Sequence, residues 1–176
     1  MIGNSIAGML GVGGSLNSYE SIATTILSSS QSSVTFSSIT SSYTHLQVRL
    51  STTSSAAANF CYQVNGDTAT NYSWHEVYGD GASAASWRAA TQAQGYFIYS
   101  PSTNPTVAVI DFLDYANTNK YKTFRSLAGQ DNNGSGRVEL TSTNWRNTNA
   151  ITSITIYPST GTFSTYGIFA LYGIKG

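Results

Sequence analysis

The stretch from Phe60 to Ser83, FCYQVNGDTATNYSWHEVYGDGAS, contains the clearest indication of this chain's fold. At its start, Phe60, Tyr62 and Val64 alternate with Cys and Gln, which is the two-residue period of a half-buried strand. Asn65-Gly66 then supplies the positive φ that a tight turn requires. A second alternating run follows the turn. The stretch therefore predicts two strands joined by a loop.

The second run places large rings on one side and smaller or titratable groups on the other. The two predicted faces are Tyr72, Trp74, Glu76 and Tyr78 against Ser73, His75 and Val77. A carboxylate in an aromatic row must either find polar partners or stay exposed to water. The exposure of Trp74 and His75 is the property of this run that most needs to be known.

Outward from this stretch, the chain consists of short alternating runs separated by segments rich in Gly, Pro, Asn, Asp and Ser. Its high Ser and Thr content also disfavours helices. About eleven strands and no long helix predict an all-β fold, a single antiparallel β-sandwich of jelly-roll-like type. The expected strands are Tyr19–Ser28, Ser33–Ile39, Tyr43–Ser51, Asn59–Val64, Tyr72–Tyr78, Gly95–Tyr99, Thr106–Leu113, Tyr121–Leu127, Arg137–Ser142, Ile151–Tyr157 and Tyr166–Ile174.

Composition limits the partners that the chain is expected to bind. A length of 176 residues is typical of one domain, and only 9% of the residues are charged. Eight basic residues balance eight acidic ones, so no net field attracts nucleic acid or anionic lipid. We therefore expect no nucleic-acid partner and no membrane partner.

The first eighteen residues are predicted to form an arm, Met1–Ser18, ahead of a sandwich domain over residues 19–176. Apolar residues in the arm fall at helical spacing, but five glycines interrupt them. The segment lacks the basic start of a secretory signal, so we expect no secretion signal. We expect the arm to dock on a neighbouring subunit.

Cys61 is the only cysteine, so an internal disulfide is excluded and a buried thiol is expected. The two histidines, His45 and His75, raise the hypothesis of a hydrolase triad. No Gly-x-Ser-x-Gly elbow accompanies them, and the nearest match, Gly3–Ala7, lacks the final glycine. Ordinary strand packing is the expectation for both histidines.

Two carboxylates, Asp111 and Asp114, raise the hypothesis of a glycosidase pair. A separation of three residues places them on opposite faces of a strand, whereas paired acid chemistry needs both in one pocket. We expect Asp111 to pair with a cation of the Lys120–Arg125 region and Asp114 to lie at the entrance of a loop. An enzyme that degrades polysaccharide would instead gather Asp111, Asp114, Glu76 and Asp80 on one face.

The segment Asp131–Gly136, DNNGSG, is the nearest approach to a calcium loop. Ser142 stands where that loop needs a bidentate glutamate, so hairpin-turn chemistry is the preferred interpretation. No catalytic, cofactor-binding or metal-binding residue is predicted. Exposed aromatic rings would stack on sugars, so the candidates for a glycan platform are Trp74, Trp87, Trp145 and the many tyrosines. The alternative is that these rings belong to the core, as most aromatic rings of a β-sandwich do.

Six distinctive stretches make up much of the chain after residue 18. They are YESIATTILSSSQSSVTFSSI (19–39), SYTHLQVRL (42–50), VNGDTATNYSWHEVYGDGAS (64–83), IDFLDYANTNKYKTFRSLAGQDNNGSG (110–136), WRNTNAITSITIYPSTGTF (145–163) and STYGIFALYGIKG (164–176). Taken together they resemble a family of small virion structural proteins of tailed bacteriophages, common in cyanophages and other aquatic phages. The arm and the segment Ala84–Gln94 lie outside this resemblance.

The resemblance implies a jelly-roll-like sandwich that assembles on the virion, as a homotrimer, and carries no active site. It implies either a decoration or cement protein that binds the major capsid protein, or a component of the tail apparatus. Cement proteins act by adding binding free energy to a shell that is already assembled. A receptor-binding or carbohydrate-binding β-sandwich of a tail fibre or spike is the alternative.

Overall fold

The computed structural model describes residues 18–101 and 104–175, and all the secondary-structure elements within these ranges are β-strands. The arm predicted over Met1–Ser18 lies outside the described residues, apart from Ser18. No helix of the described part is long and apolar enough to cross a bilayer. The strands are β1 (Tyr19–Ile26), β2 (Val34–Phe36), β3 (His45–Thr52), β4 (Ala58–Val64), β5 (Tyr72–Gly79), β6 (Ala84–Gln92), β7 (Gly95–Ser100), β8 (Thr106–Phe112), β9 (Lys122–Asp131), β10 (Gly136–Trp145), β11 (Ile154–Pro158) and β12 (Ile168–Ile174).

Eight of these strands form nested pairs: the first strand pairs with the last, and each further pair lies between the members of the previous one in the sequence. β1 pairs with β12, β2 with β11, β3 with β8, and β4 with β7, all antiparallel. Successive pairs alternate between two sheets, which is how a long hairpin winds into a jelly roll. The expected antiparallel β-sandwich is therefore confirmed.

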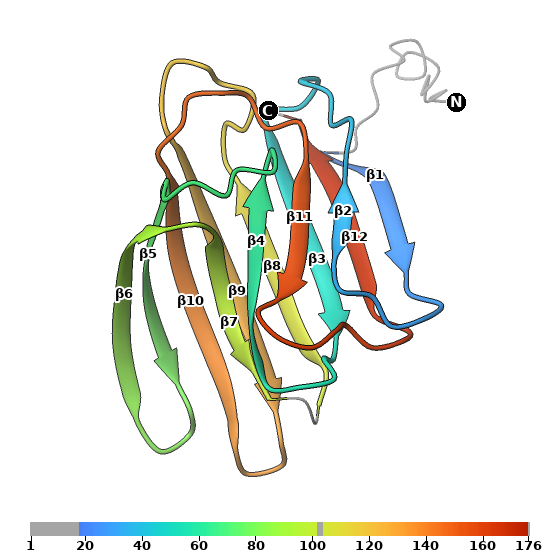
Figure 1. Ribbon diagram of the computed structural model, residues 1–176, viewed down its shortest axis with the longest axis vertical. Coiled ribbons are helices and arrows are strands. Elements are labelled where there is room, and N and C mark those ends of the chain that lie inside the picture. Colours follow the sequence, from blue (N-terminus) through green and yellow to red (C-terminus); the bar gives the residue numbers. More distant parts are fainter. Residues whose placement is uncertain (1–17, 102–103, 176) are drawn as a thin grey trace, which may run out of the picture.

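The other four strands form two inserted hairpins that enlarge one sheet. β5–β6 follows β4 and β9–β10 follows β8, and β10 pairs with β5. The result is an eight-stranded sheet, β1-β12-β3-β8-β9-β10-β5-β6, facing a four-stranded sheet, β2-β11-β4-β7. β7 packs over β10, β9 and β5, whereas β6 lies beyond the edge of the smaller sheet (Figure 1).

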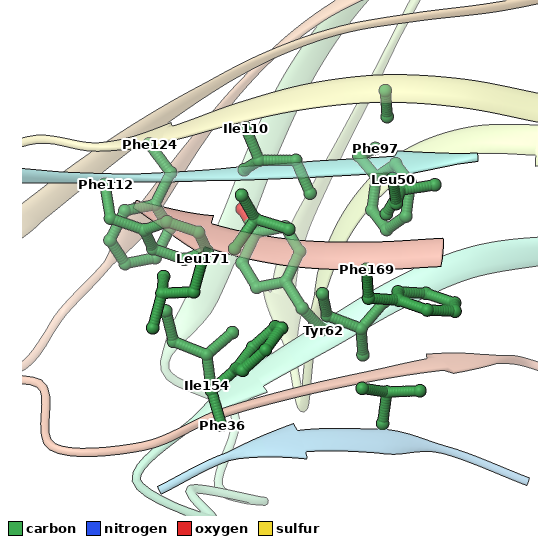
Figure 2. Close-up of a cluster of buried hydrophobic side chains, with 14 of the residues drawn as sticks. Phe36, Leu50, Tyr62, Phe97, Ile110, Phe112, Phe124, Ile154, Phe169 and Leu171 are labelled. Atoms are coloured by element: carbon green, nitrogen blue, oxygen red, sulfur yellow. The ribbon is translucent and has the colours of Figure 1, made fainter. Parts of the chain in front are cut away.

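The core between the two sheets is built largely from aromatic rings (Figure 2). The Tyr62 ring packs edge-on against Phe112 and Phe124, whose own centroids are 4.8 Å apart. Each fully buried ring contributes roughly 2–3 kcal/mol through removal of apolar surface from water. A Cβ atom at Gly95 would lie 2.3 Å from the Tyr62 ring, so only glycine allows β7 to approach this closely.

Eleven strands were expected near their observed positions, and one, β6, was missed. Seven of its nine residues are exposed, and four of the nine are alanine, which favours strands weakly. Such a strand has no buried face and therefore no alternation of hydrophobic and polar residues. Its position is set by its pairing with β5.

The stretch 60–83 does form two strands, β4 and β5, but they belong to different sheets. Asn65 and Gly66 adopt positive φ as expected, at 54° and 64°. The Asn65 side chain accepts hydrogen bonds from the backbone N–H groups of Thr152 and Ser153 and donates one to the Ala150 carbonyl. The turn is thus a corner between the two sheets rather than a hairpin.

Candidate binding site

A cleft opens where the inner face of the larger sheet emerges from beneath β7. We call it the acid–aromatic cleft; its volume is about 290 Å³, and it is lined by Asn59, Trp74, Glu76, Trp87, Tyr96, Tyr99 and Arg137. The alternation of β5 turns Trp74 and Glu76 inward, and the pairing of Glu76 with Trp87 brings the tryptophan of β6 to the same place. The cleft therefore depends on the inserted hairpins.

Charged groups form a closed network on one side of the cleft. The Arg137 Nε donates to Glu139 Oε2 at 2.6 Å, and its terminal nitrogen lies 3.3 Å from Glu76 Oε1. The Tyr96 hydroxyl donates to the same Glu139 oxygen at 3.1 Å. The guanidinium also lies over the Tyr78 ring, 3.6 Å from its centroid. Because Glu139 is fully buried, this network supplies the partners that its carboxylate needs.

The pKa of Glu76 is raised above its usual value of 4.5, first by burial, then by the charge of Glu139 and by a hydrogen bond between the two carboxyl groups. Arg137 opposes this rise without cancelling it. Burial and the neighbouring carboxylates also raise the pKa of Tyr96, which keeps its phenol a donor. With Glu76 protonated, the negative charge of Glu139 and the positive charge of Arg137 balance.

Glycoside hydrolysis needs two carboxyl groups separated by about 5 to 9.5 Å, with room for a sugar or a water molecule between them. Glu76 and Glu139 are instead close enough to interact with each other and with Arg137. Only Glu76 of the two lines the cleft, so the pair does not face a ligand across it.

Aromatic rings form the remaining walls. Trp74 stacks on Tyr96 with a centroid distance of 5.5 Å and an interplanar angle of 28°. Trp87 and Tyr99, which are 67% and 41% exposed, also line the cleft. The Trp74 indole N–H is buried with no partner at hydrogen-bonding distance, although it is near enough to Glu76 to favour that carboxylate.

Replacing Glu76 with Gln tests the raised pKa. A carboxyl group whose pKa is raised in the folded protein favours folding below its unfolded pKa, and this contribution is lost as the pH rises through the folded pKa. The unfolding free energy of the wild type should therefore fall, relative to Glu76→Gln, as the pH rises from 4.5 to 8. At pH 8 the variant should be more stable by about 1–3 kcal/mol, since one pKa unit corresponds to about 1.4 kcal/mol.

Urea denaturation across this pH range measures the difference. Glu20→Gln is the matched control, because the exposed Glu20 pairs with Lys175 and its pKa is lowered. The control should not gain stability over wild type as the pH rises. A Glu76→Gln profile parallel to wild type would contradict a raised pKa of Glu76.

The structure keeps the two histidines apart. His45 lies at the start of β3, where its Nδ1 accepts the backbone N–H of Asp114 at 2.9 Å. His75 is exposed on the outer face of β5, opposite Arg88 and Ser142 of the neighbouring strands. Three strands, β8, β9 and β10, separate β3 from β5, so no site contains both histidines.

The two aspartates behave as expected. Asp111 forms an ion pair with Arg125 at 2.7 Å, and Asp114 begins the following turn with a φ of 49°. Lys120 pairs with Asp114 and, by hydrogen bonding, lowers the pKa of its carboxyl. Asp111, Asp114, Glu76 and Asp80 therefore do not converge on one face.

The DNNGSG segment is the β9–β10 turn, as its composition indicated. Asp131 accepts the backbone N–H of Asn133 at 2.7 Å, and Asn133 and Gly134 both adopt positive φ. Across residues 18–101 and 104–175, no group of three or more His, Cys, Asp and Glu side chains is arranged to hold a metal ion.

Of the three tryptophans proposed for a glycan platform, two reach the cleft. Trp145 is buried, donates to Asp67 at 2.7 Å and stacks on Tyr72, so its role is structural. Cys61 is buried as expected, and burial raises the pKa of its thiol to about 12, which leaves it unreactive.

Sequence reasoning missed Arg137 and Glu139. Two opposite charges two residues apart within an expected strand share a face, and this was the available signal. This signal was hidden because the alternate positions hold Val138 and Leu140, which are apolar and would ordinarily be assigned to the buried face. In the structure Glu139 and Thr141 are buried, while Val138 and Leu140 are exposed.

The outer face of the larger sheet carries these exposed apolar side chains in register. Val109, Leu127, Leu140 and Val77 are successive cross-strand neighbours on β8, β9, β10 and β5. Beside them Val107 and Val138 flank Gly129, which leaves a shallow hollow. We call these six residues the outer apolar band; each is between 37% and 62% exposed.

No protein-family model and no curated protein sequence matches the chain. A crystal structure of exo-inulinase from Aspergillus awamori is similar over 89% of this chain and 29% of that one, with 16% identity and a TM-score of 0.48. The chain thus spans less than a third of the inulinase. A similarity of this size transfers no activity.

Proposed function

We propose that the chain is a non-enzymatic structural protein of a tailed-bacteriophage particle, a decoration or cement protein whose outer apolar band is covered by another copy of itself. The band carries this proposal. It joins apolar side chains from four strands on a face that no other element in the described part of the chain covers. Contiguous exposed apolar surface of this kind marks an interaction site.

Covering the band supplies a substantial free energy of association. Each of its six side chains is about half exposed, and burying the remainder contributes roughly 1 kcal/mol per side chain. The chain has no net charge, so copies of it do not repel one another at long range. The resemblance to virion structural proteins supports the same assignment, with a homotrimer as the expected assembly and the major capsid protein as the expected partner.

Gradient-purified particles of the phage that encodes the chain provide the test. Mass spectrometry should find the protein in the particles at many copies each. Cryo-electron microscopy should place twelve-stranded sandwiches on the outside of the head, with the outer apolar bands facing neighbouring copies. Absence from the particles would overturn the virion assignment, and density confined to the tail would overturn the decoration role.

A further inference from the structure

We propose that the acid–aromatic cleft binds a neutral, hydroxyl-rich ring of a saccharide. This site is separate from the outer apolar band, because the two lie on opposite faces of the larger sheet. A copy that uses its outer face for assembly keeps the cleft available. The proposal therefore goes beyond particle binding and does not depend on it.

The exposed rings supply the apolar part of the recognition. A pyranose ring presents a face of C–H bonds that packs on an aromatic face, and Trp offers the largest such surface. Trp87 is 67% exposed and lines the cleft together with Tyr99. Leaving so large a ring in water costs free energy that a stacked sugar would recover.

Polar groups meet the ring at its edge. The Asn59 amide, the Glu76 carboxyl and the Arg137 guanidinium line the same space. Together they offer donors and acceptors to sugar hydroxyls, which both donate and accept.

The charge balance of the cleft selects a neutral ligand. Arg137 already meets Glu139 and Glu76, so its positive charge is compensated within the protein. An anionic sugar would approach the two carboxyl groups, and a cationic one would approach the guanidinium. Neither would find an uncompensated opposite charge, whereas a neutral ring pays no such penalty.

Three neutral probes test the proposal: methyl α-D-mannopyranoside, methyl β-D-galactopyranoside and methyl β-D-glucopyranoside. With the intact chain, saturation-transfer NMR should show transfer to the ring protons of at least one probe, and tryptophan fluorescence should change as that probe is added. Trp87→Ala should weaken the binding by about tenfold or more, because an exposed aromatic anchor dominates such a contact. The thermal midpoint of this variant should stay near that of wild type, since the exposed Trp87 ring contributes little to the core.

Tyr166→Ala is the matched control, because Tyr166 is an 82% exposed ring outside the cleft. This variant should bind like wild type. Equal loss in both variants, or no transfer to any of the three probes, would overturn the site. Methyl β-D-glucuronide binding as tightly as the neutral sugars would overturn the charge argument. None of these results bears on whether the protein is found in the particle.

Discussion

Lys122→Met is expected to lower the free energy of unfolding by about 3–5 kcal/mol, because it leaves buried carbonyl oxygens without the hydrogen-bond donor that the ammonium supplies. Lys122 lies at the start of β9 and is fully buried. Its Nζ donates to the carbonyl oxygens of Asn117, Lys120 and Thr148, the last two at 3.1 Å. Methionine matches the length of the side chain but donates to none of them.

The loss should propagate to two loops at once. The three carbonyls lie on the segments before β9 and after β10, so one ammonium joins loops far apart in sequence. Hydrogen exchange should therefore show faster opening of residues 113–121 and 146–153 in the variant than in wild type. Chemical denaturation gives the change in free energy.

Lys120→Met separates this effect from a simple loss of charge. Lys120 is 56% exposed and pairs with Asp114 at the surface, an interaction worth about 0–1 kcal/mol. The control should therefore change stability little. Equal losses in the two variants would show that the buried donor has no special role.

Leu127→Glu should weaken association between copies by about a hundredfold or more, since it places an unpaired charge at the centre of the outer apolar band. Leu127 neighbours Val109 on β8 and Leu140 on β10. A carboxylate covered by those side chains loses its water and gains no partner. Because Leu127 is 57% exposed in the single chain, the fold itself should tolerate the change.

Sedimentation over a range of concentrations measures this effect. Thr123→Glu is the control, because Thr123 is exposed on the same strand and the same face but outside the band. It should assemble like wild type. If Leu127→Glu assembled as well as wild type, or if wild type did not associate, the proposal that the outer apolar band joins copies would be wrong.

Local patterns were enough to predict most strands of this fold. β3 alternates Leu46, Val48 and Leu50 with polar residues, so both its existence and its buried face follow from the sequence. β8 is different, because it is apolar on both faces and its exposed Val107 and Val109 resemble core residues until their neighbours are known. The outer apolar band was therefore not predictable, although the four strands that carry it were.

The cleft depends on contacts between residues far apart in sequence. Glu76 was expected either to have polar partners or to be exposed. It has partners, but they come from β10, about sixty residues later. Trp87 lies on β6, which local propensity did not reveal. Only the register of β5 between β10 and β6 brings these residues together.

The edge position of β6 has a consequence for how this protein can vary. A single neighbour, β5, holds β6 in place, and seven of its nine side chains contact solvent rather than the core. Substitutions in this strand therefore alter one wall of the cleft at little cost to folding, while the jelly roll beneath tolerates few changes. The molecule thus combines a tightly packed frame with an edge strand that accepts substitutions, and libraries that aim at new binding preferences should begin with Ala84–Gln92.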